Sequence, residues 1–385
     1  MEPLLKYIQY LPYLGGGLLW GLVMTPLAGA LARKFGFLDL PPAMRGNKDN
    51  TKSRRVHSVP IPRLGGVVIT MPILIMPLLL PATPWLLGLA FCVGVMDIMA
   101  LLDDKYELRG NIQFLVLGLV AVIAALSGIT ILHASSFLDG ELSFSAGAVS
   151  ATLLGSEFRW SILAVVVTVV WLCIVANAIN WTDLLGGLAS TISGLAIMVV
   201  MLVAIRDANH EVAVISAIIF GAILGFLPFN VIPERIFLGG GSMALGFLVA
   251  ALSVLAKTKF STWIMVLGMP VIDFFIVIIG RTVRAKPKSF GAFLKAISTG
   301  DKTHLAFKLK EAGLERYQVF WVMAGITLLF AIVALIASGL MLTLVVVGVC
   351  VIIIVGYLLI DGFLKRKQKQ ETGSEGATPE ARYSY

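Results

Sequence analysis

Long apolar runs dominate this chain and restrict the folds that are open to it. A helix needs about 20 consecutive apolar residues to cross the hydrocarbon core of a bilayer. The sequence holds about eleven runs near that length, separated by short polar segments. We therefore predict an all-α, polytopic integral membrane protein with about eleven transmembrane helices. The predicted spans cover 11–32, 64–82, 85–102, 112–132, 160–179, 184–205, 212–230, 238–256, 262–282, 318–338 and 341–362.

The composition agrees with a membrane domain, since 58% of the residues are apolar and only 14% are charged. We expect residues 1–364 to form a single transmembrane domain, and the polar residues 365–385 to form a disordered cytoplasmic tail. Each of the three cysteines, Cys92, Cys173 and Cys350, falls inside a predicted span. We interpret them as small apolar residues, not as disulfide partners or metal ligands.

The net charge of +8 follows the membrane and does not indicate a nucleic-acid partner. If the N-terminus is outside, the inside segments carry about 25 of the 30 Lys and Arg residues. Such an excess of Lys and Arg on one side is typical of the cytoplasmic face. We therefore predict an outside N-terminus and a cytoplasmic C-terminus, with the lipid membrane as a partner. The remaining cations, on the outside, are Lys6, Arg159, Arg206, Lys257 and Lys259.

A polar motif separates the fifth and sixth apolar runs. Asn177, Asn180 and Asp183 recur every three residues, so on a helix their side chains lie on nearly one face. Polar groups at a membrane helix end are costly unless they are solvated or partnered. The motif therefore indicates a site, or else a helix cap followed by a polar turn.

Adjacent carboxylates, Asp103 and Asp104, end the third span. Because like charges repel, the pair favours a bound cation, a bound proton or a role as a base. Helix capping and solvation at the membrane interface explain one such residue more easily than two in series. Both residues belong to the same predicted cytoplasmic face as the Asn177–Asp183 motif.

Glycines mark two further helix entrances. Gly239, Gly240 and Gly241 precede the eighth span, where exposed backbone N–H groups and the helix dipole favour an anion. Close helix packing is the alternative explanation. The second span is preceded by Pro-Ile-Pro-Arg63-Leu-Gly-Gly, which is more specific than a basic anchor on acidic lipids requires. His304 lies in the long basic inside segment 283–317, where a solvated side chain is the ordinary expectation.

These motifs resemble those of the polyprenyl-phosphate N-acetylhexosamine-1-phosphate transferases over about residues 10–360. Those membrane enzymes move a sugar 1-phosphate from a UDP-sugar to a lipid phosphate and release UMP. The matching motifs are Val56-His57 with the Pro-Arg-Leu-Gly-Gly stretch, Leu102-Asp103-Asp104 with Glu107-Leu108, Asn177-Ala-Ile-Asn180-Trp-Thr-Asp183, and Asp301 to Leu305. The first of these is similar to the branch that uses UDP-N-acetylglucosamine (UDP-GlcNAc).

The chain also departs from that family's pattern. Where the family has Asp-Gly-x-Asp-Gly, this chain has Leu184 in place of the first Gly and Gly186 in place of the second Asp. Its Phe-x-Gly-Asp-x-Gly-Ser entrance, whose Asp ligates magnesium, is one residue shorter here and lacks the carboxylate. Gln113 aligns with a family Lys, and the loop that begins at His304 keeps one imidazole.

The resemblance implies the following site. Asp103, Asp104 and Asp183 would be catalytic, and Asn180 with Asp104 would bind Mg2+ or Mn2+. Substrate would be bound by Arg63, Asn177, Asn180, Gly239, Gly240, Gly241 and His304. The implied activity is the first membrane step of cell-envelope glycan synthesis on undecaprenyl phosphate, at the cytoplasmic face of the bacterial inner membrane. A homodimer is kept as a candidate assembly.

Two other hypotheses remain beside an active transferase. An inactive relative would bind polyprenyl phosphate or scaffold a partner enzyme, in agreement with the missing carboxylate and histidines. A secondary transporter would need charged residues at mid-membrane, where Asp97 and Asp273 are the candidates. For an active enzyme we expect activity that needs unusually high magnesium and that rises when Gly240 is replaced by Asp.

Overall fold

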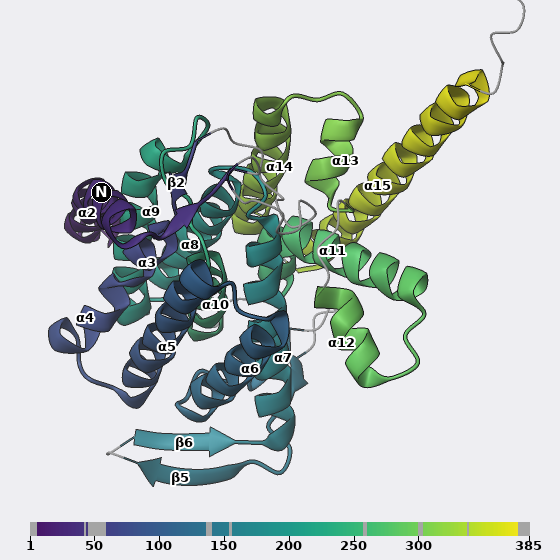
Figure 1. Ribbon diagram of the computed structural model, residues 1–385. Helices are drawn as coiled ribbons and strands as arrows, with labels where there is room; N and C mark the ends of the chain where they lie inside the picture. Colours follow the sequence, from purple (N-terminus) through teal and green to yellow (C-terminus); the bar gives the residue numbers. More distant parts are fainter. Residues whose placement is uncertain are drawn as a thin grey trace, which may run out of the picture.

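A computed structural model describes residues 6–41, 44, 59–135, 141–153, 156–256, 260–298, 303–336 and 339–375. Helices account for most of this chain (Figure 1). Their bounds are α2 Leu11–Phe35, α3 Gly65–Thr70, α4 Pro72–Leu79, α5 Pro84–Tyr106, α6 Gly110–Leu126, α7 Ile162–Thr182, α8 Leu188–Arg206, α9 His210–Asn230, α10 Gly241–Leu255, α11 Phe260–Ala285, α12 Phe290–Ser298, α13 Leu305–Glu311, α14 Arg316–Ile336 and α15 Gly339–Glu375.

The structure confirms a helical, polytopic membrane protein. Across the described ranges, eight helices are long and apolar enough to cross a membrane, and three shorter apolar helices accompany them. The shorter ones are Gly65–Leu79, Gly110–Leu126 and Gly241–Leu255. The predicted span 64–82 is divided at Met71, since Pro72 begins α4 and its ring cannot donate a helix hydrogen bond. The number of crossings and their orientation stay predictions.

The helices form a bundle with an apolar interior and an apolar surface. Nearly all side chains of α10 are buried, and α8 and α9 are the most buried of the long apolar helices. By contrast, the apolar stretch Val347–Leu364 of α15 is hardly covered by the rest of the protein, and α15 extends away from the bundle (Figure 1). Apolar side chains on the outside of a helical bundle face lipid in a membrane protein.

Glycines allow α2 and α9 to pack with their backbones in contact. A Cβ atom at Gly21 would lie 2.4 Å from the carbonyl oxygen of Ala222, and one at Gly225 would lie 2.4 Å from that of Leu18. Gly17 and Gly221 make the same kind of approach one turn away. This is the small-residue packing that membrane helices use, because lipid offers no hydrophobic driving force for helix association.

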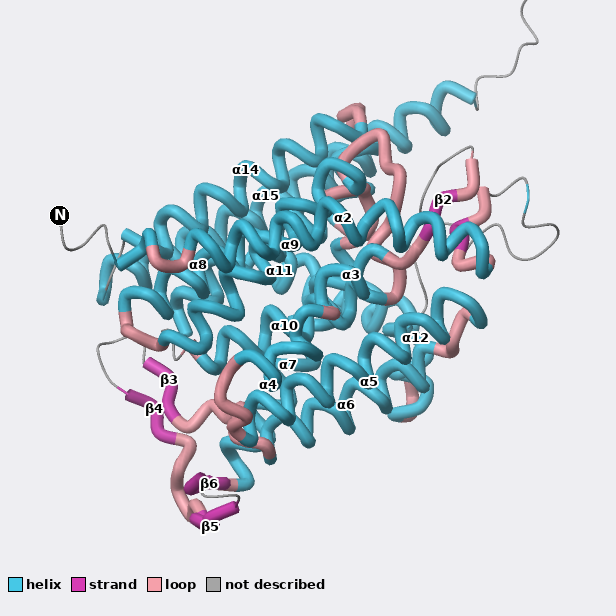
Figure 2. The backbone as a smooth tube through the Cα atoms, turned by 90° about the vertical axis from the view of Figure 1, so that its left-hand side faces the viewer, coloured by secondary structure: helices cyan, strands magenta, loops and turns pink. Residues whose placement is uncertain are grey.

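Short antiparallel strand pairs lie outside the bundle. They are β1 Leu38–Asp39 with β2 Ile61–Pro62, β3 His133–Ser135 with β4 Glu141–Ser143, and β5 Val149–Leu153 with β6 Ser156–Trp160. The register pairs Asp39 with Ile61, His133 with Ser143, and Val149 with Trp160. Figure 2 shows β2 at one end of the bundle and β3 to β6 at the other. The segments predicted to lie on opposite membrane faces are therefore at opposite ends of the protein.

Two C-terminal predictions meet different outcomes. The apolar spacing of Phe290, Phe293, Leu294 and Ile297 predicts an amphipathic helix, and α12 confirms a helix at that place. The tail expected from residue 365 begins inside α15, which continues to Glu375. Residues 376–385, and His57 of the Val-His motif, lie outside the described residues. The division into a domain and a tail stays a prediction.

Candidate active site

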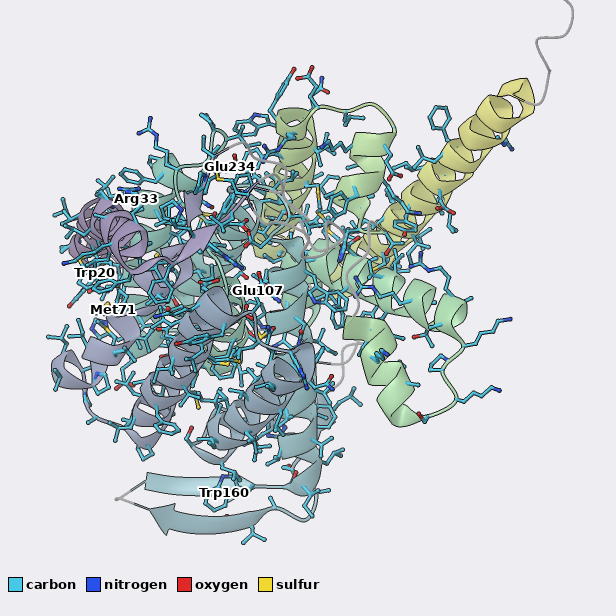
Figure 3. All side chains as sticks on the ribbon, in the orientation of Figure 1. Trp20, Arg33, Met71, Glu107, Trp160 and Glu234 are labelled. Atoms are coloured by element: carbon cyan, nitrogen blue, oxygen red, sulfur yellow. The ribbon has the colours of Figure 1, made fainter. Side chains whose placement is uncertain are left out.

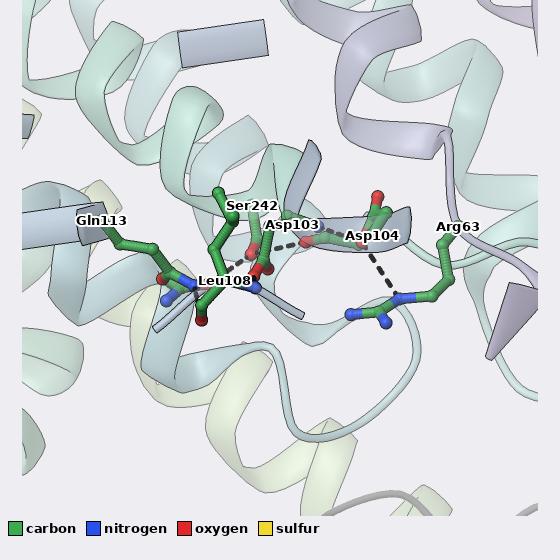
Figure 4. A network of polar contacts seen from close by, with 9 residues as sticks. Arg63, Asp103, Asp104, Leu108, Gln113 and Ser242 are labelled. Atoms are coloured by element: carbon green, nitrogen blue, oxygen red, sulfur yellow. Dashed lines mark hydrogen bonds and ion pairs between the residues drawn. The ribbon is translucent and has the colours of Figure 1, made fainter. Parts of the chain in front are cut away.

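Three of the sequence motifs meet at the carboxylate of Asp104. Its Oδ1 atom lies 3.1 Å from Nε of Arg63 and accepts a hydrogen bond of 2.9 Å from the backbone N–H of Gly240. Figure 4 shows Asp104 between Asp103 and Arg63. Both side chains of the pair are largely withdrawn from solvent, and Asp104 is the more deeply buried one. A single buried carboxylate thus joins α5, the loop before α3 and the start of α10.

Backbone pairing holds Arg63 in this position. The N–H of Phe237 donates to the carbonyl of Pro62, and the N–H groups of Gly65 and Gly66 donate to the carbonyls of Phe237 and Leu238. A Cβ atom on Gly66 would lie 2.4 Å from the carbonyl carbon of Gly241, so only glycine permits this contact between α3 and α10. Gly66 is therefore explained by the close approach of two helix starts, and Gly65 by the Phe226 ring and the carbonyl of Phe237, which lie within 2.6 Å of its added Cβ.

Arg63 lies among four carboxylates. Burial acts to lower its pKa, but the negative charges around it outweigh burial, and the pKa of Arg63 is raised above its usual value. The carboxylates responsible, in order of effect, are Asp104, Asp39, Asp103 and Asp183. Arg63 therefore stays charged at any physiological pH, and the structure brings all three predicted catalytic aspartates into its field.

Asp103 is oriented by two hydrogen bonds to one oxygen. Its Oδ1 atom accepts from the backbone N–H of Leu108 at 3.0 Å and from Nε2 of Gln113 at 2.8 Å (Figure 4). The second bond comes from the residue that replaces a family Lys. The Gln113 amide donates to Asp103, and also to the carbonyl of Leu108 at 3.3 Å, but it carries no charge, whereas an ammonium would. Gln113 thus keeps the orienting contact of Asp103 without neutralising it.

The two asparagines of the α7 motif face different environments. Oδ1 of Asn180 accepts a hydrogen bond of 2.7 Å from the hydroxyl of Ser242, at the start of α10. Asn177 is buried, and its amide donates to the carbonyl of Cys173 one turn earlier in the same helix. Asn180 is therefore linked through α10 to the residues around Arg63, which are called the Arg63 group below: Arg63, Asp39, Asp103, Asp104, Asp183 and Gly240. Asn177, whose role in substrate binding stays a prediction, is bonded within its own helix.

Asp183 ends α7 and begins the turn that leads to α8. It is buried, and the turn closes with Gly187 in the left-handed region at φ 82°. The N–H of Gly187 donates to Oδ1 of Asn230, which also accepts from the hydroxyl of Ser190. The turn is thus held by a side chain from the end of α9.

His304 belongs to a separate cluster that packs against Trp181, near the C-terminal end of α7. Its imidazole is fully buried, and Nδ1 lies 2.8 Å from Oδ2 of Asp273. Trp181 meets the His304 ring edge to face, and the guanidinium of Arg281 lies over the Trp181 ring. Since Trp181 follows Asn180, the end of α7 separates the two groups. The predicted role of His304 in holding UDP stays a prediction, and in this structure its ring is covered by protein.

The glycines at the start of α10 serve protein contacts. The N–H of Gly240, expected to bind phosphate directly, is donated to Asp104. A Cβ atom on Gly240 would lie 2.9 Å from the Cα and carbonyl oxygen of Ala100, so an Asp there must displace the backbone. The expected gain of activity from that substitution stays a prediction, and it requires the backbone around Ala100 to shift. Gly239 has φ 66°, and its own Cβ would meet Asp104 and the carbonyl of Arg63.

The sequence did not reveal which side chains contact the predicted site residues. Ser242 contacts Asn180, Gln113 contacts Asp103, and Asp273 contacts His304. Asp273 was recognisable as a charge inside an apolar run, and Ser242 as the last residue of the glycine stretch. Their partners lie 62 and 31 residues away in the chain, so spacing does not reveal the contacts.

The donors around Arg63 suit a hard divalent cation. Mg2+ takes carboxylate and amide oxygens and keeps several waters. Here four carboxylates share the field of one guanidinium, which leaves negative charge for a further cation to neutralise. Within the residues that the structure describes, no three His, Cys, Asp or Glu side chains group closely enough to hold a metal ion. The described residues thus offer no ready-made cluster of three such ligands, and the Mg2+ site stays a prediction.

Comparison with known proteins gives a consistent assignment. A family model described as glycosyl transferase family 4 matches residues 86–257. The chain is 27% identical over 366 residues to a probable undecaprenyl-phosphate N-acetylglucosaminyl 1-phosphate transferase of Bacillus subtilis, covering 92% of this chain and 93% of the relative.

Two further relatives extend the range of similarity. A phospho-N-acetylmuramoyl-pentapeptide-transferase of Shouchella clausii is 31% identical over 67% of this chain and 78% of its own length. A decaprenyl-phosphate N-acetylglucosaminephosphotransferase of Mycobacterium leprae is 25% identical over 82% of this chain and 79% of its own length. The match includes the acidic pair, the α7 motif and the entrance to α10. This chain belongs to glycosyl transferase family 4.

Proposed function

We propose that this chain transfers an N-acetylhexosamine 1-phosphate from a UDP-sugar to a polyprenyl phosphate and releases UMP. The observation that carries the proposal is the meeting of three motifs at Asp104, with Arg63 and Gly240 on the same carboxylate oxygen. A transfer between two phosphates needs charge control at one place, because donor and acceptor are both anions. The group around Arg63 offers acidic residues, a guanidinium and an amide oxygen together.

The reaction exchanges one phosphorus–oxygen bond for another. An oxygen of the polyprenyl phosphate attacks the phosphorus that carries the sugar. The bond between that phosphorus and the bridging oxygen of the diphosphate breaks, and UMP leaves with the bridging oxygen. Because the attacking phosphate is already largely ionised near neutral pH, the protein has little proton transfer to perform.

Each residue of the group has a role in this scheme. Arg63 pairs with diphosphate or lipid phosphate oxygens as well as with Asp104, since a guanidinium presents several donors. Asp103, fixed by Gln113, keeps the acceptor phosphate ionised or orders it. Asp183 and Asn180 supply oxygens at the end of α7. We expect catalysis to come from positioning and charge stabilisation.

A divalent cation is part of the proposal. When bound, Mg2+ (or Mn2+) would neutralise diphosphate charge and polarise the reacting phosphorus. Asp104 and Asn180 would hold it with water. Asp104 also contacts Arg63, and Asn180 also contacts Ser242, so both proposed ligands are already oriented by protein contacts.

We infer a UDP-GlcNAc-like donor. The relatives from Bacillus subtilis and Mycobacterium leprae bear names that specify N-acetylglucosamine, and both match most of this chain. The Shouchella clausii relative is named for a muramoyl-pentapeptide. The Val56-His57 and Pro-Arg63-Leu-Gly-Gly stretch favours the first donor, as the sequence resemblance implies. A panel of donors decides between them.

We infer further that the Arg63 group lies on the cytoplasmic face of a bacterial inner membrane, with the N-terminus outside. The support is the Lys and Arg excess and the position of β2 opposite the β3–β6 strands (Figure 2). Cysteine labelling in a cysteine-free background tests the orientation at Ser143 and Ser298. Labelling of both positions from one side would contradict it. A homodimer stays a prediction.

One observation favours a second candidate function. Oδ1 of Asp104 is already engaged by protein, because it pairs with Arg63 and accepts the N–H of Gly240. A carboxylate oxygen held in this way is compatible with an inactive relative that binds polyprenyl phosphate or scaffolds a partner enzyme. Such a protein would bind the lipid phosphate without releasing UMP.

The deciding experiment measures UMP release by purified protein in lipid nanodiscs. The acceptor is undecaprenyl phosphate, and the donors are UDP-GlcNAc, UDP-N-acetylgalactosamine and UDP-muramoyl-pentapeptide, each titrated with Mg2+. Turnover with one of the first two donors supports the proposal. Binding of undecaprenyl phosphate without turnover at any Mg2+ concentration would establish the second candidate instead.

A further inference from the structure

Two side chains from the end of α9 and the loop after it hold the turn that follows Asp183. Asn230 is the last residue of α9, and Glu234 lies in the loop that joins α9 to α10. Oδ1 of Asn230 accepts the N–H of Gly187 at 3.1 Å, and Oε1 of Glu234 accepts the N–H of Gly186 at 3.2 Å. The backbone of the turn is therefore fixed at two consecutive residues by groups more than 40 positions away.

Glu234 occupies the space into which a side chain at position 186 would project. A Cβ atom built on Gly186 would lie 1.9 Å from Cγ of Glu234, and 2.5 Å from both its Cδ and Oε1. The Glu234 side chain is only 5% exposed. A side chain on residue 186 therefore cannot coexist with the present position of the Glu234 side chain. A carboxylate attached to residue 186 would occupy nearly the same space as the carboxylate of Glu234.

Arg316, the first residue of α14, completes the arrangement by pairing with Oε1 of Glu234. The pair is partly buried, since the side chain of Arg316 is 30% exposed, and removal of Glu234 takes this carboxylate away from the Arg316 charge. Phe320, one turn further along α14, lies near the turn: a Cβ atom on Gly187 would be 3.3 Å from its ring. Glu234 thus connects the turn to α14 as well as to its own loop. Figure 3 shows Glu234 on the side of the bundle opposite Trp160 of β6.

We propose that Glu234 is a positioning residue, which supplies from the α9–α10 loop the carboxylate that the turn lacks at Gly186, and which thereby holds Asp183 in place. The inference rests on the proposed function, in which Asp183 acts on the charged substrates. It agrees with the departure seen in the sequence, where Gly186 stands at an acidic position of the motif.

Exchanging the carboxylate between the two positions tests this inference. The variants are Glu234→Ala, Gly186→Asp, the double variant with both changes, and Glu234→Gln, with the exposed Glu311→Ala as a matched control. For each, kcat and KM for UDP-GlcNAc are measured by UMP release, and the melting temperature is measured in the same nanodiscs.

We expect Glu234→Ala to lower kcat about tenfold, the loss expected for a hydrogen bond to a charged group, with little change in KM. Gly186→Asp alone should lose more, because two carboxylates then compete for one space. The double variant should recover to within about threefold of the wild type, a non-additive result that only contacting positions give. Glu234→Gln should fall between, since its amide oxygen still accepts from Gly186 but does not neutralise Arg316.

Two outcomes would overturn the proposed role of Glu234. A double variant no better than Glu234→Ala, or a wild-type kcat in both Glu234→Ala and Glu234→Gln, overturns the inference. If the wild type releases no UMP with any donor, the proposed function fails, and the melting temperatures still decide the exchange. Recovery of the melting temperature in the double variant then supports the shared carboxylate position, and additive losses reject it.

Discussion

Asp104 accepts the backbone N–H of Gly240 at 2.9 Å across 136 residues of sequence. The glycine entrance to α10 was expected to present its N–H groups to a phosphate, and one of them instead binds a protein carboxylate. A helix N-terminus stabilises negative charge, so Asp104 gains from this contact as an external anion would. The same carboxylate pairs with Arg63, and thereby couples the loop before α3 to α10.

Asp104→Asn should abolish UMP release while it preserves the contact with Gly240. The amide oxygen can still accept that N–H, but the ion pair with Arg63 and the charge for a cation are lost. A drop of at least about a hundredfold in kcat is expected, in the range of about 10²–10³ found when one group that stabilises charge in the transition state is removed. Asp207→Asn, which removes one partner of an exposed ion pair with Arg206, is the control and should keep wild-type activity. Turnover insensitive to Asp104→Asn would contradict the site.

Gly240→Ala should lower both the melting temperature and the activity. Its Cβ atom would lie 2.9 Å from the backbone of Ala100, so α5 and α10 must separate. Overpacking of this kind costs about 1–3 kcal/mol. Gly118→Ala in α6 is the matched control, because no heavy atom lies within 4 Å of the added Cβ. Thermal unfolding in detergent compares the two, and equal melting temperatures would mean that the α5–α10 contact is looser than described.

Gln113→Lys should keep UMP release within about threefold of the wild type, because an ammonium also donates to Asp103. Gln113→Leu removes the donor and should lower kcat about tenfold, since a hydrogen bond to a carboxylate contributes about 1.5–3 kcal/mol. Both variants are assayed at saturating UDP-GlcNAc and undecaprenyl phosphate. Retained activity in Gln113→Leu would show that the N–H of Leu108 alone orients Asp103.

His304→Ala should destabilise the protein more than it weakens nucleotide binding. The substitution leaves Asp273 buried without its imidazole partner and removes the ring that packs against Trp181. A buried acceptor that loses its hydrogen-bond partner costs about 1–3 kcal/mol. Melting temperature and KM for UDP-GlcNAc are measured together. A large rise in KM at an unchanged melting temperature would instead restore the direct role in holding UDP that the sequence resemblance implies.

Gly21→Ala should weaken the packing of α2 on α9, because its Cβ atom would lie 2.4 Å from the carbonyl oxygen of Ala222. The expected cost is about 1–3 kcal/mol, in the range of overpacked interfaces. Gly16→Ala, five residues earlier on the same helix, meets no heavy atom within 4 Å and is the matched control. Thermal unfolding of the two variants in one detergent tests the contact. A fall for both, or for neither, would argue against it.

Much of the fold could be predicted from the sequence alone. The length of each apolar run indicates a membrane-spanning helix, because every backbone polar group in lipid must be hydrogen-bonded within the helix. The spans around α7, α8 and α9 were therefore placed to within a few residues. The break at Met71 was less visible, since Pro72 lies inside an otherwise continuous apolar run.

The sequence by itself determined the class of the protein, the polar motifs and the residues of the acidic pair, because these depend on local composition and spacing. Only the tertiary structure decided which groups those residues contact: Asp104 with Gly240, Asn180 with Ser242, and Glu234 in the space beside Gly186. The physical reason is that such contacts join helix ends that lie close together only after the helices pack. Packing depends on the shapes of whole helix faces, and no local pattern records it.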